Sequence, residues 1–214
     1  MDGAIKIADA ATSTPEAGTI RWNPATNDFE GYTGIEWKSL TRSTAKKWGN
    51  TTYTSTENEK VLASDGAAGD RFGSSVSISG DYALIGSFLD DDNGTNSGAT
   101  YVFHRSGNNW MEQAKLLASD GDESDFFGIS VSISGDYALI GASGNNENGS
   151  NSGAAYVFHR SGNNWTEQAK LLASDGAAED RFGSSVSISG EYALIGAWGG
   201  GDNGNTAGAA YFFR

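Results

Sequence analysis

The sequence predicts an all-β fold built from three copies of one unit, and three observations lead to that prediction. A segment that opens at Lys60 returns 55 residues later at Lys115 and again at Lys170. Within each copy, small polar and apolar residues alternate with a period of two, which is the period of a strand. Glycine occupies 30 of 214 positions, too many for long helices, because each interior glycine costs a helix about 1 kcal/mol.

Each copy divides into four short strands separated by turn-forming residues. In the first copy we expect strands at 75–79, 82–86, 99–105 and 110–117. Gly80 and Asp81 fit a two-residue hairpin turn, and residues 90–98 are turn formers only. Four short antiparallel strands in a repeat of this length are typical of a β-propeller blade.

The domain boundaries follow from the period. We expect propeller repeats over 60–214, divided as 60–114, 115–169 and 170–214. A linker at 46–59 precedes them, and its length and composition also suit a strand that closes the terminal blade. Residues 1–45 lie outside the period and predict a small β segment for attachment or oligomerisation. This segment is too short to hold a core of its own.

The repeats resemble a known family. Phe72-Gly73 is followed by Gly86-Ser87-Phe88, and Phe182-Gly183 is followed in the same register by Gly196-Ala197-Trp198. This pattern is similar to the FG-GAP repeat, which builds the propellers of integrin alpha chains and many bacterial surface proteins. The resemblance covers 60–214 and implies a propeller with an adhesive or ligand-binding role, without naming the ligand.

The N-terminal segment carries a second, shorter resemblance. The run Gly-Thr-Ile-Arg-Trp-Asn at 18–23, with Phe-Glu-Gly-Tyr at 29–32 and then Trp37, resembles a motif beside the receptor-binding parts of phage and injection-system tail fibres. The start of the chain has no basic and apolar stretch of the kind that marks a secretory signal. We therefore expect an extracellular or particle-associated protein of fibre type.

Three blades are too few to close a ring, because propellers typically have about 4–8 blades. We therefore expect a homo-oligomer. Two chains would give six blades, within that range, whereas fibre proteins of the resembling kind are usually trimers. Dimer and trimer both stay open, and an open stack of sheets is the alternative.

Composition argues against several classes of protein. The net charge of -13 disfavours nucleic acid, whose recognition relies on clustered Lys and Arg. No apolar run approaches the roughly 20 residues of a membrane helix, so no membrane insertion is expected. His104 and His159 are equivalent positions of two repeats, and neither comes with the nucleophile and carboxylate of a hydrolytic site. We therefore expect no enzyme.

One loop offers oxygen ligands for calcium. Asp90 and Asp92 supply hard carboxylates within a flexible segment, which calcium favours. The alternative is a solvated turn, and the falling carboxylate number in the equivalent loops favours it. In integrin-type repeats the calcium loop joins the first two strands, where this chain has only Gly80 and Asp81, so that site does not carry over. No other cofactor is expected.

The loops after the second strand vary between copies and form the candidate ligand surface, because such loops emerge on one side of a propeller. Trp198 could stack on a sugar ring or pack between blades, and both readings stay open. Trp110 and Trp165 are expected to pack structurally, and the Asp residues at 65, 70 and their equivalents to cap turns. The candidate ligand-binding residues are Phe88, Asp91, Asn93, Glu147, Asn148, Trp198, Asp202 and Asn203.

Two functions follow from these observations. The first is a non-enzymatic adhesin or receptor-binding, tail-fibre-like module that recognises a cell-surface glycan or protein through propeller loops. The alternative is a structural subunit of an extracellular fibre or of a phage or injection-system particle, with no ligand of its own.

Overall fold

The computed structural model describes residues 59–201 and 206–214, together with Thr33, Glu57 and the short strands within 1–58. The chain separates into two compact units, Met1–Asn58 and Glu59–Arg214. The described residues form strands and turns and no helix, which confirms the all-β prediction. Accordingly, none of these residues belongs to a helix long and apolar enough to cross a bilayer.

The first unit contains two small sheets. The larger has the order β1-β2-β3-β4 and consists of β1 (Lys6–Ile7), β2 (Thr19–Asn23), β3 (Asp28–Tyr32) and β4 (Trp37–Ser39). The hairpin predicted around Thr33 is confirmed, because β3 pairs antiparallel with β4. The second sheet pairs β5 (Lys46–Trp48) with β6 (Thr51–Tyr53). The closing-strand role of 46–59 stays a prediction.

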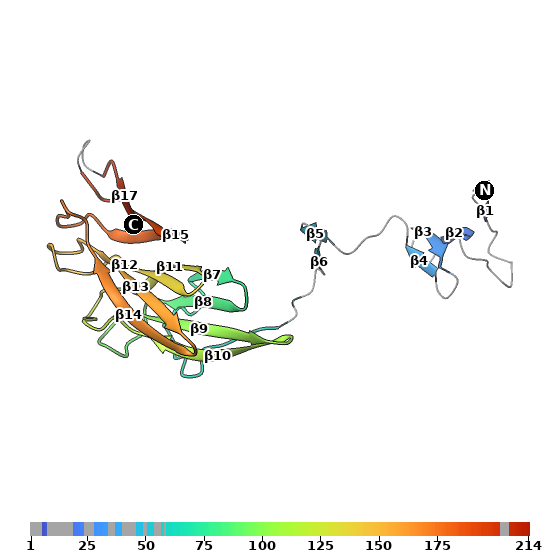
Figure 1. The fold of residues 1–214 in the computed structure, drawn as a ribbon, viewed down its shortest axis with the longest axis horizontal. Helices are drawn as coiled ribbons and strands as arrows, with labels where there is room; N and C mark the ends of the chain where they lie inside the picture. Colours follow the sequence, from blue (N-terminus) through green and yellow to red (C-terminus); the bar gives the residue numbers. More distant parts are fainter. Residues whose placement is uncertain are drawn as a thin grey trace. The chain divides into compact units, whose positions relative to one another are not determined.

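The second unit consists of three antiparallel sheets, each made from consecutive strands (Figure 1). The first contains β7 (Ser75–Ser79), β8 (Tyr82–Ser87), β9 (Ala99–Ser106) and β10 (Asn109–Leu116). The second contains β11 (Phe127–Ser134), β12 (Tyr137–Ala142), β13 (Ala154–Ser161) and β14 (Asn164–Leu171). The third contains β15 (Phe182–Ser189), β16 (Tyr192–Ala197) and β17 (Ala209–Phe213).

The blade prediction is therefore confirmed in its local form. The first two sheets have the four strands expected of a blade, whereas the third has three, because the 170–214 copy holds only the first three strands of the unit. The three sheets do not close into a ring. The structure has blade-like sheets and does not show a complete propeller.

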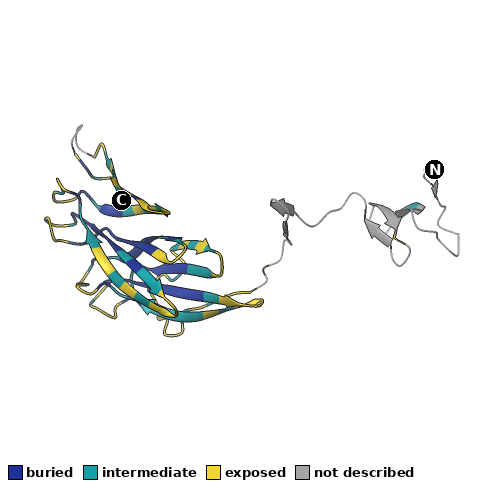
Figure 2. Cartoon of the chain, viewed as in Figure 1, coloured by how far each residue is buried: buried dark blue, intermediate teal, exposed yellow. Residues whose placement is uncertain are grey.

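The sheets pack on one another through their first strands. Strand β11 lies against β7 and β8, and β15 lies against β11 and β12, whereas the outer strands β10 and β14 barely touch. Leu84, Val131 and Ile133 belong to the core between the first two sheets. Figure 2 shows the buried residues concentrated in the inner strands of the sheets. The first sheet also has a small core of its own, in which Ile85, Tyr101 and Phe103 pack against Val61 and Phe72.

Serine side chains join the first strands of neighbouring sheets. An edge strand leaves backbone N–H groups unpaired, and burying them without a partner is costly. Here serine hydroxyls on β7 accept hydrogen bonds from the edge of β11: Ser75 from Val131 N at 3.0 Å, Ser77 from Ile133 N at 3.1 Å and Ser79 from Gly135 N at 3.3 Å. The pattern recurs from β15 to β11, where Ile188 N bonds Ser132 and Gly190 N bonds Ser134. The alternating sequence therefore directs serines to the next sheet and aliphatic residues to the preceding one.

A second joint between the sheets involves the Phe-Gly and Gly-Ala pairs. Phe127 N donates to Ser97 O at 2.8 Å, and Gly98 forms a parallel bridge with Phe127. A β-carbon on Gly98 would overlap the Phe127 carbonyl oxygen, and one on Gly128 would overlap the Ala99 carbonyl oxygen. Only glycine allows this approach. The same joint links the second and third sheets through Gly153, Phe182, Gly183 and Ala154.

Candidate ligand-binding loops

The loops that follow the second strand span 88–98, 143–153 and 198–208 and leave the equivalent end of each sheet. The sequence placed all its candidate ligand residues in these loops. The structure describes them except for residues 202–205, so Asp202 and Asn203 lie outside the described residues.

The base of the first loop is held by one ammonium group. Lys115 Nζ, on β10, lies 2.8 Å from Asp65, 2.9 Å from Asp90 and 2.6 Å from Asp92. The hydroxyl of Tyr101 donates to Asp65 at 2.6 Å and lies 3.0 Å from a carboxylate oxygen of Asp90. These contacts tie the loop, the segment before β7 and two outer strands together. We call this cluster of five residues the first brace.

Electrostatics favour the charged forms of Lys115 and Asp65 in the first brace. Burial opposes the charge of Lys115, but its hydrogen bonds to the three carboxylates outweigh burial and raise its pKa above the ordinary value. The hydrogen bond from Lys115, followed by that from Tyr101, lowers the pKa of Asp65. The pKa of Tyr101 is raised by burial and by Asp65. The brace is therefore an ion-paired structural unit near neutral pH.

The candidate calcium ligands lie within this brace. The structure does bring Asp90 and Asp92 together, but both carboxylates are paired with Lys115 Nζ. The ammonium group thus occupies the position that a cation would take between them. The described part of the chain contains no group of three His, Asp or Glu side chains suited to a metal ion. Calcium binding stays a prediction, and a calcium ion would compete with Lys115 for the two carboxylates.

The second repeat contains a brace with one carboxylate fewer. Lys170 Nζ lies 2.7 Å from Asp120 and 2.9 Å from Glu147, and the Tyr156 hydroxyl donates to Asp120 at 2.8 Å. Asn145 stands in the position of Asp90. Glu147, a predicted ligand residue, is therefore engaged by a lysine of its own sheet. In the third repeat Tyr211 donates to Asp175 at 2.9 Å.

The turn-capping prediction holds for one of the two sets of aspartates. Asp70 accepts from Ala67 N at 2.6 Å, and Asp125 and Asp180 accept equivalent backbone bonds. The set that begins with Asp65 instead accepts from tyrosine hydroxyls. The braces were not predicted from the sequence. The signal that could have revealed them is the recurrence of Asp65, Tyr101 and Lys115 after 55 residues, as Asp120, Tyr156 and Lys170.

Three more candidate residues hold the loops in place. Asn93 Nδ2 donates to Ala118 O at 3.1 Å, and Asn148 Nδ2 donates to Ala173 O at 3.3 Å. These bonds fasten each loop to the segment that leads into the next sheet. Asp91 accepts from Asn96 N at 2.7 Å within its own loop. These three candidate residues are therefore engaged in hydrogen bonds within the chain.

The first residue of the loop differs between the three copies. Phe88 packs edge-on against Phe126 of the second sheet, with ring centroids 6.0 Å apart. Ser143 at the equivalent place is buried, whereas Trp198 is 60% exposed. Trp198 is the candidate residue that presents the largest apolar surface to solvent among those described.

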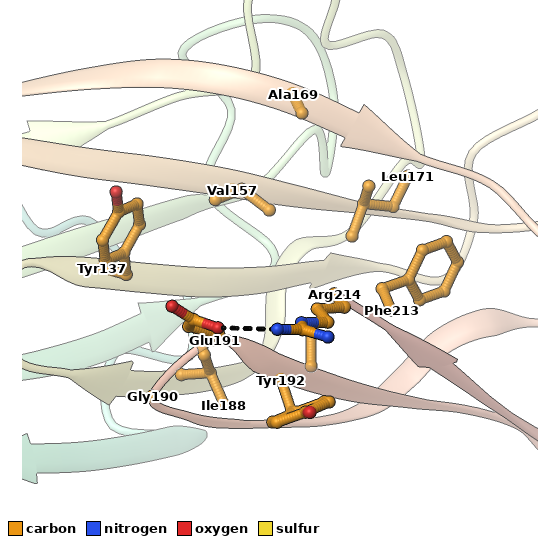
Figure 3. A pocket seen from close by; sticks show the side chains of 11 residues that line it. Tyr137, Val157, Ala169, Leu171, Ile188, Gly190, Glu191, Tyr192, Phe213 and Arg214 are labelled. Atoms are coloured by element: carbon orange, nitrogen blue, oxygen red, sulfur yellow. Dashed lines mark hydrogen bonds and ion pairs between the residues drawn. The ribbon is translucent and has the colours of Figure 1, made fainter.

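A groove of about 570 Å³ lies between the second and third sheets. Figure 3 shows Tyr137, Val157 and Phe213 along it, with an ion pair of 3.5 Å between Arg214 and Glu191. At the equivalent place between the first two sheets, Trp165 of β14 packs edge-on against Tyr82. The three-stranded third sheet offers no counterpart of Trp165, so the groove stays open.

The remaining aromatic and histidine predictions concern packing. Trp110 and Trp165 pack against buried clusters, as predicted. His104 and His159 stack at 4.6 Å on the tyrosines opposite them in the neighbouring strand.

Successive antiparallel sheets, joined by serine hydrogen bonds and by interlocked Phe-Gly and Gly-Ala pairs, define a repeat protein built from propeller-type blades. The family model for the FG-GAP repeat matches residues 55–103, 110–158 and 165–213. The chain therefore belongs to the FG-GAP repeat family. No curated protein matches it. The second and third matched segments begin in the fourth strand of one predicted repeat and end in the third strand of the next, whereas the first begins in the predicted linker at 46–59. The matches do not reach the segment at 1–45, whose resemblance to fibre proteins stays a prediction.

Proposed function

We propose that this chain is a non-enzymatic binding module, an adhesin or receptor-binding part of fibre type, that recognises a cell-surface glycan or protein outside the cell or on a particle. The loops after the second strands supply the contact surface. The observation that carries the proposal is the exposed indole of Trp198, the first residue of a glycine-rich loop.

The braces support this proposal physically. Ion pairs around Lys115 and Lys170 hold the first and second loops in place, so a ligand that contacts these loops pays little to order them. In the third repeat, whose loop carries Trp198, the described contact of this kind is the hydrogen bond from Tyr211 to Asp175. A rigid aromatic face beside small residues leaves room for the flat face of a sugar ring.

The test is binding of the full chain to a glycan array, followed by titration of any hit. We expect Trp198→Ala to lose at least tenfold in affinity while its thermal midpoint stays unchanged. Met111→Ala, which removes an exposed apolar side chain on β10, is the matched control and should bind as the wild type does. Unchanged affinity in Trp198→Ala would remove this residue from the site.

The structural-subunit alternative has an observation of its own. Phe88 packs on Phe126 of the following sheet, so Trp198 in the same register could pack on a further sheet of an assembly instead of on a ligand. If no array component binds and Trp198→Ala lowers the assembled mass, the structural function is favoured. If the mass is unchanged and glycan binding falls, the binding function is favoured.

A further inference from the structure

We propose that two copies of this chain associate head to tail, with the outer face of the first sheet in one copy packed on the outer face of the third sheet in the other. We call these surfaces the β7 face and the β15 face. The partner is a second copy because neighbouring sheets within the chain already pack through surfaces of these two kinds. The β15 face of one copy would contact the β7 face of another as the first sheet contacts the second.

The β7 face is an aliphatic surface that no sheet of the described part of 59–214 covers. Val76 and Ile78 are 67% and 65% exposed. Their equivalents in the second sheet, Val131 and Ile133, are 7% and 6% exposed because the first sheet covers them. Strand β7 is also a sheet edge. Val76, Ile78 and Gly80 are the equivalents of Val131, Ile133 and Gly135. Their N–H groups therefore point away from the first sheet, at its free edge.

The β15 face offers the complementary serines. Ser187 and Ser189 are exposed, whereas Ser77 and Ser79 in the same register accept N–H groups from the next sheet. Leu194 is 37% exposed, although its equivalent Leu139 is fully buried. The β15 face thus has the acceptors and apolar surface that the β7 face requires.

The glycines that form the joint between sheets also have equivalents on the two faces, Gly73 and Gly208, and neither is in close contact with another sheet. A β-carbon on Gly73 would meet nothing within 4 Å, and one on Gly208 would come no closer than 3.5 Å to any atom. In the two internal joints the corresponding glycines are pressed against backbone oxygens of the neighbouring sheet. Phe72-Gly73 of one copy therefore matches Gly208-Ala209 of another.

Two further properties favour the association. The chain carries a net charge of -13, but the residues named on both faces are uncharged, so like charges do not meet at the contact. The two faces differ from each other, which makes the interface heterologous, and such interfaces form rings when the rotation closes. Two copies bring six sheets together, within the usual range of about 4–8 blades.

Gly196 provides a selective test. A β-carbon at Gly86 or Gly141 would overlap a backbone oxygen of the next sheet, whereas one at Gly196 meets only Ser185, its Cβ at 3.5 Å and its carbonyl oxygen at 3.7 Å. Gly196→Val should therefore fold normally and block the β15 face. Val76→Asp should block the β7 face by placing a carboxylate in the contact. Met111→Asp changes an exposed apolar residue on β10 outside both faces and serves as its control.

The measurement is the mass in solution of the full chain by light scattering, with thermal melting as the check on folding. We expect twice 22.4 kDa for the wild type and Met111→Asp, and a single chain for Gly196→Val and Val76→Asp. An equimolar mixture of these two variants should recover two-chain particles, because one intact face of each kind remains. A single-chain wild type, a Gly196→Val mass equal to that of the wild type, or a mixture that stays single would overturn the proposal.

Discussion

The backbone of Gly98 runs so close to Phe127 that a β-carbon on Gly98 would overlap the Phe127 carbonyl oxygen. One residue belongs to the first sheet and the other to the second, so this approach fixes the spacing of the two sheets. The sheets cannot separate slightly to admit a side chain without also lengthening the serine hydrogen bonds between β7 and β11.

Replacement of Gly98 by alanine tests this spacing. Gly98 has a φ of 88°, a left-handed conformation that costs a residue with a β-carbon about 1–2 kcal/mol. The overlap with Phe127 adds about 1–3 kcal/mol, as for overpacking. Gly135→Ala is the control, because Gly135 has a φ of 59° and open space around it. We expect denaturant unfolding to show the larger loss of stability for Gly98→Ala; equal losses would contradict the role of the joint.

Removal of the ammonium group from the first brace should destabilise the fold. Asp90 is 4% exposed at its side chain, and an unpaired buried carboxylate is costly. We expect Lys115→Met to lower the free energy of unfolding by about 2–3 kcal/mol, below the full cost of a broken buried pair because Asp65 and Asp92 are half exposed. Lys170→Met is the matched comparison and should lose less, since Asn145 replaces the buried aspartate. A larger loss in Lys170→Met would refute this explanation.

Stability should fall in acid because of the lowered carboxylate pKa values. The pKa of Asp65 lies below its ordinary 3.8, so its contribution is present above pH 3.8 and is lost as pH falls through the lower, folded value. Burial raises the pKa of Asp125, which acts in the opposite sense but equally in wild type and Lys115→Met. We expect the stability difference between these two proteins to shrink below pH 3.8. A difference constant from pH 7 to pH 2 would exclude the ion pair as its source.

Calcium should have no effect on stability. The ammonium of Lys115 already lies between Asp90 and Asp92, so a calcium ion would have to displace this ion pair before it could bind. We expect the same thermal midpoint in excess calcium and in excess chelator. A rise of several degrees in calcium would show that the loop binds the ion and that Lys115 gives way.

The strands could be predicted from the sequence because the alternation of residues along a strand and the residues of a tight turn depend on local backbone geometry. The alternation at 75–79 predicted β7, and the turn formers at 80–81 predicted the hairpin to β8. The pairing of Ser77 with Ile133 could not be predicted in this way, since it depends on how one sheet lies on the next.

The candidate site shows the same limit. The adjacent aspartates at 90–92 suggested a bound cation. The cation beside them is the side chain of Lys115, which lies 23 residues after Asp92 in the sequence. The loops after the second strand were predicted to vary between copies, and their first residues do differ, with Trp198 exposed and Ser143 buried. The covering of Phe88 by Phe126 does not follow from the sequence, because it depends on a joint between sheets.

Each sheet has one face that fits the preceding sheet and one face that fits the following sheet. This arrangement affects how the protein can change in evolution. A further 55-residue copy inserted between two existing ones would meet, on either side, surfaces it already fits. Gain or loss of a copy by recombination would therefore alter the number of loops displayed without requiring any new contact to be invented.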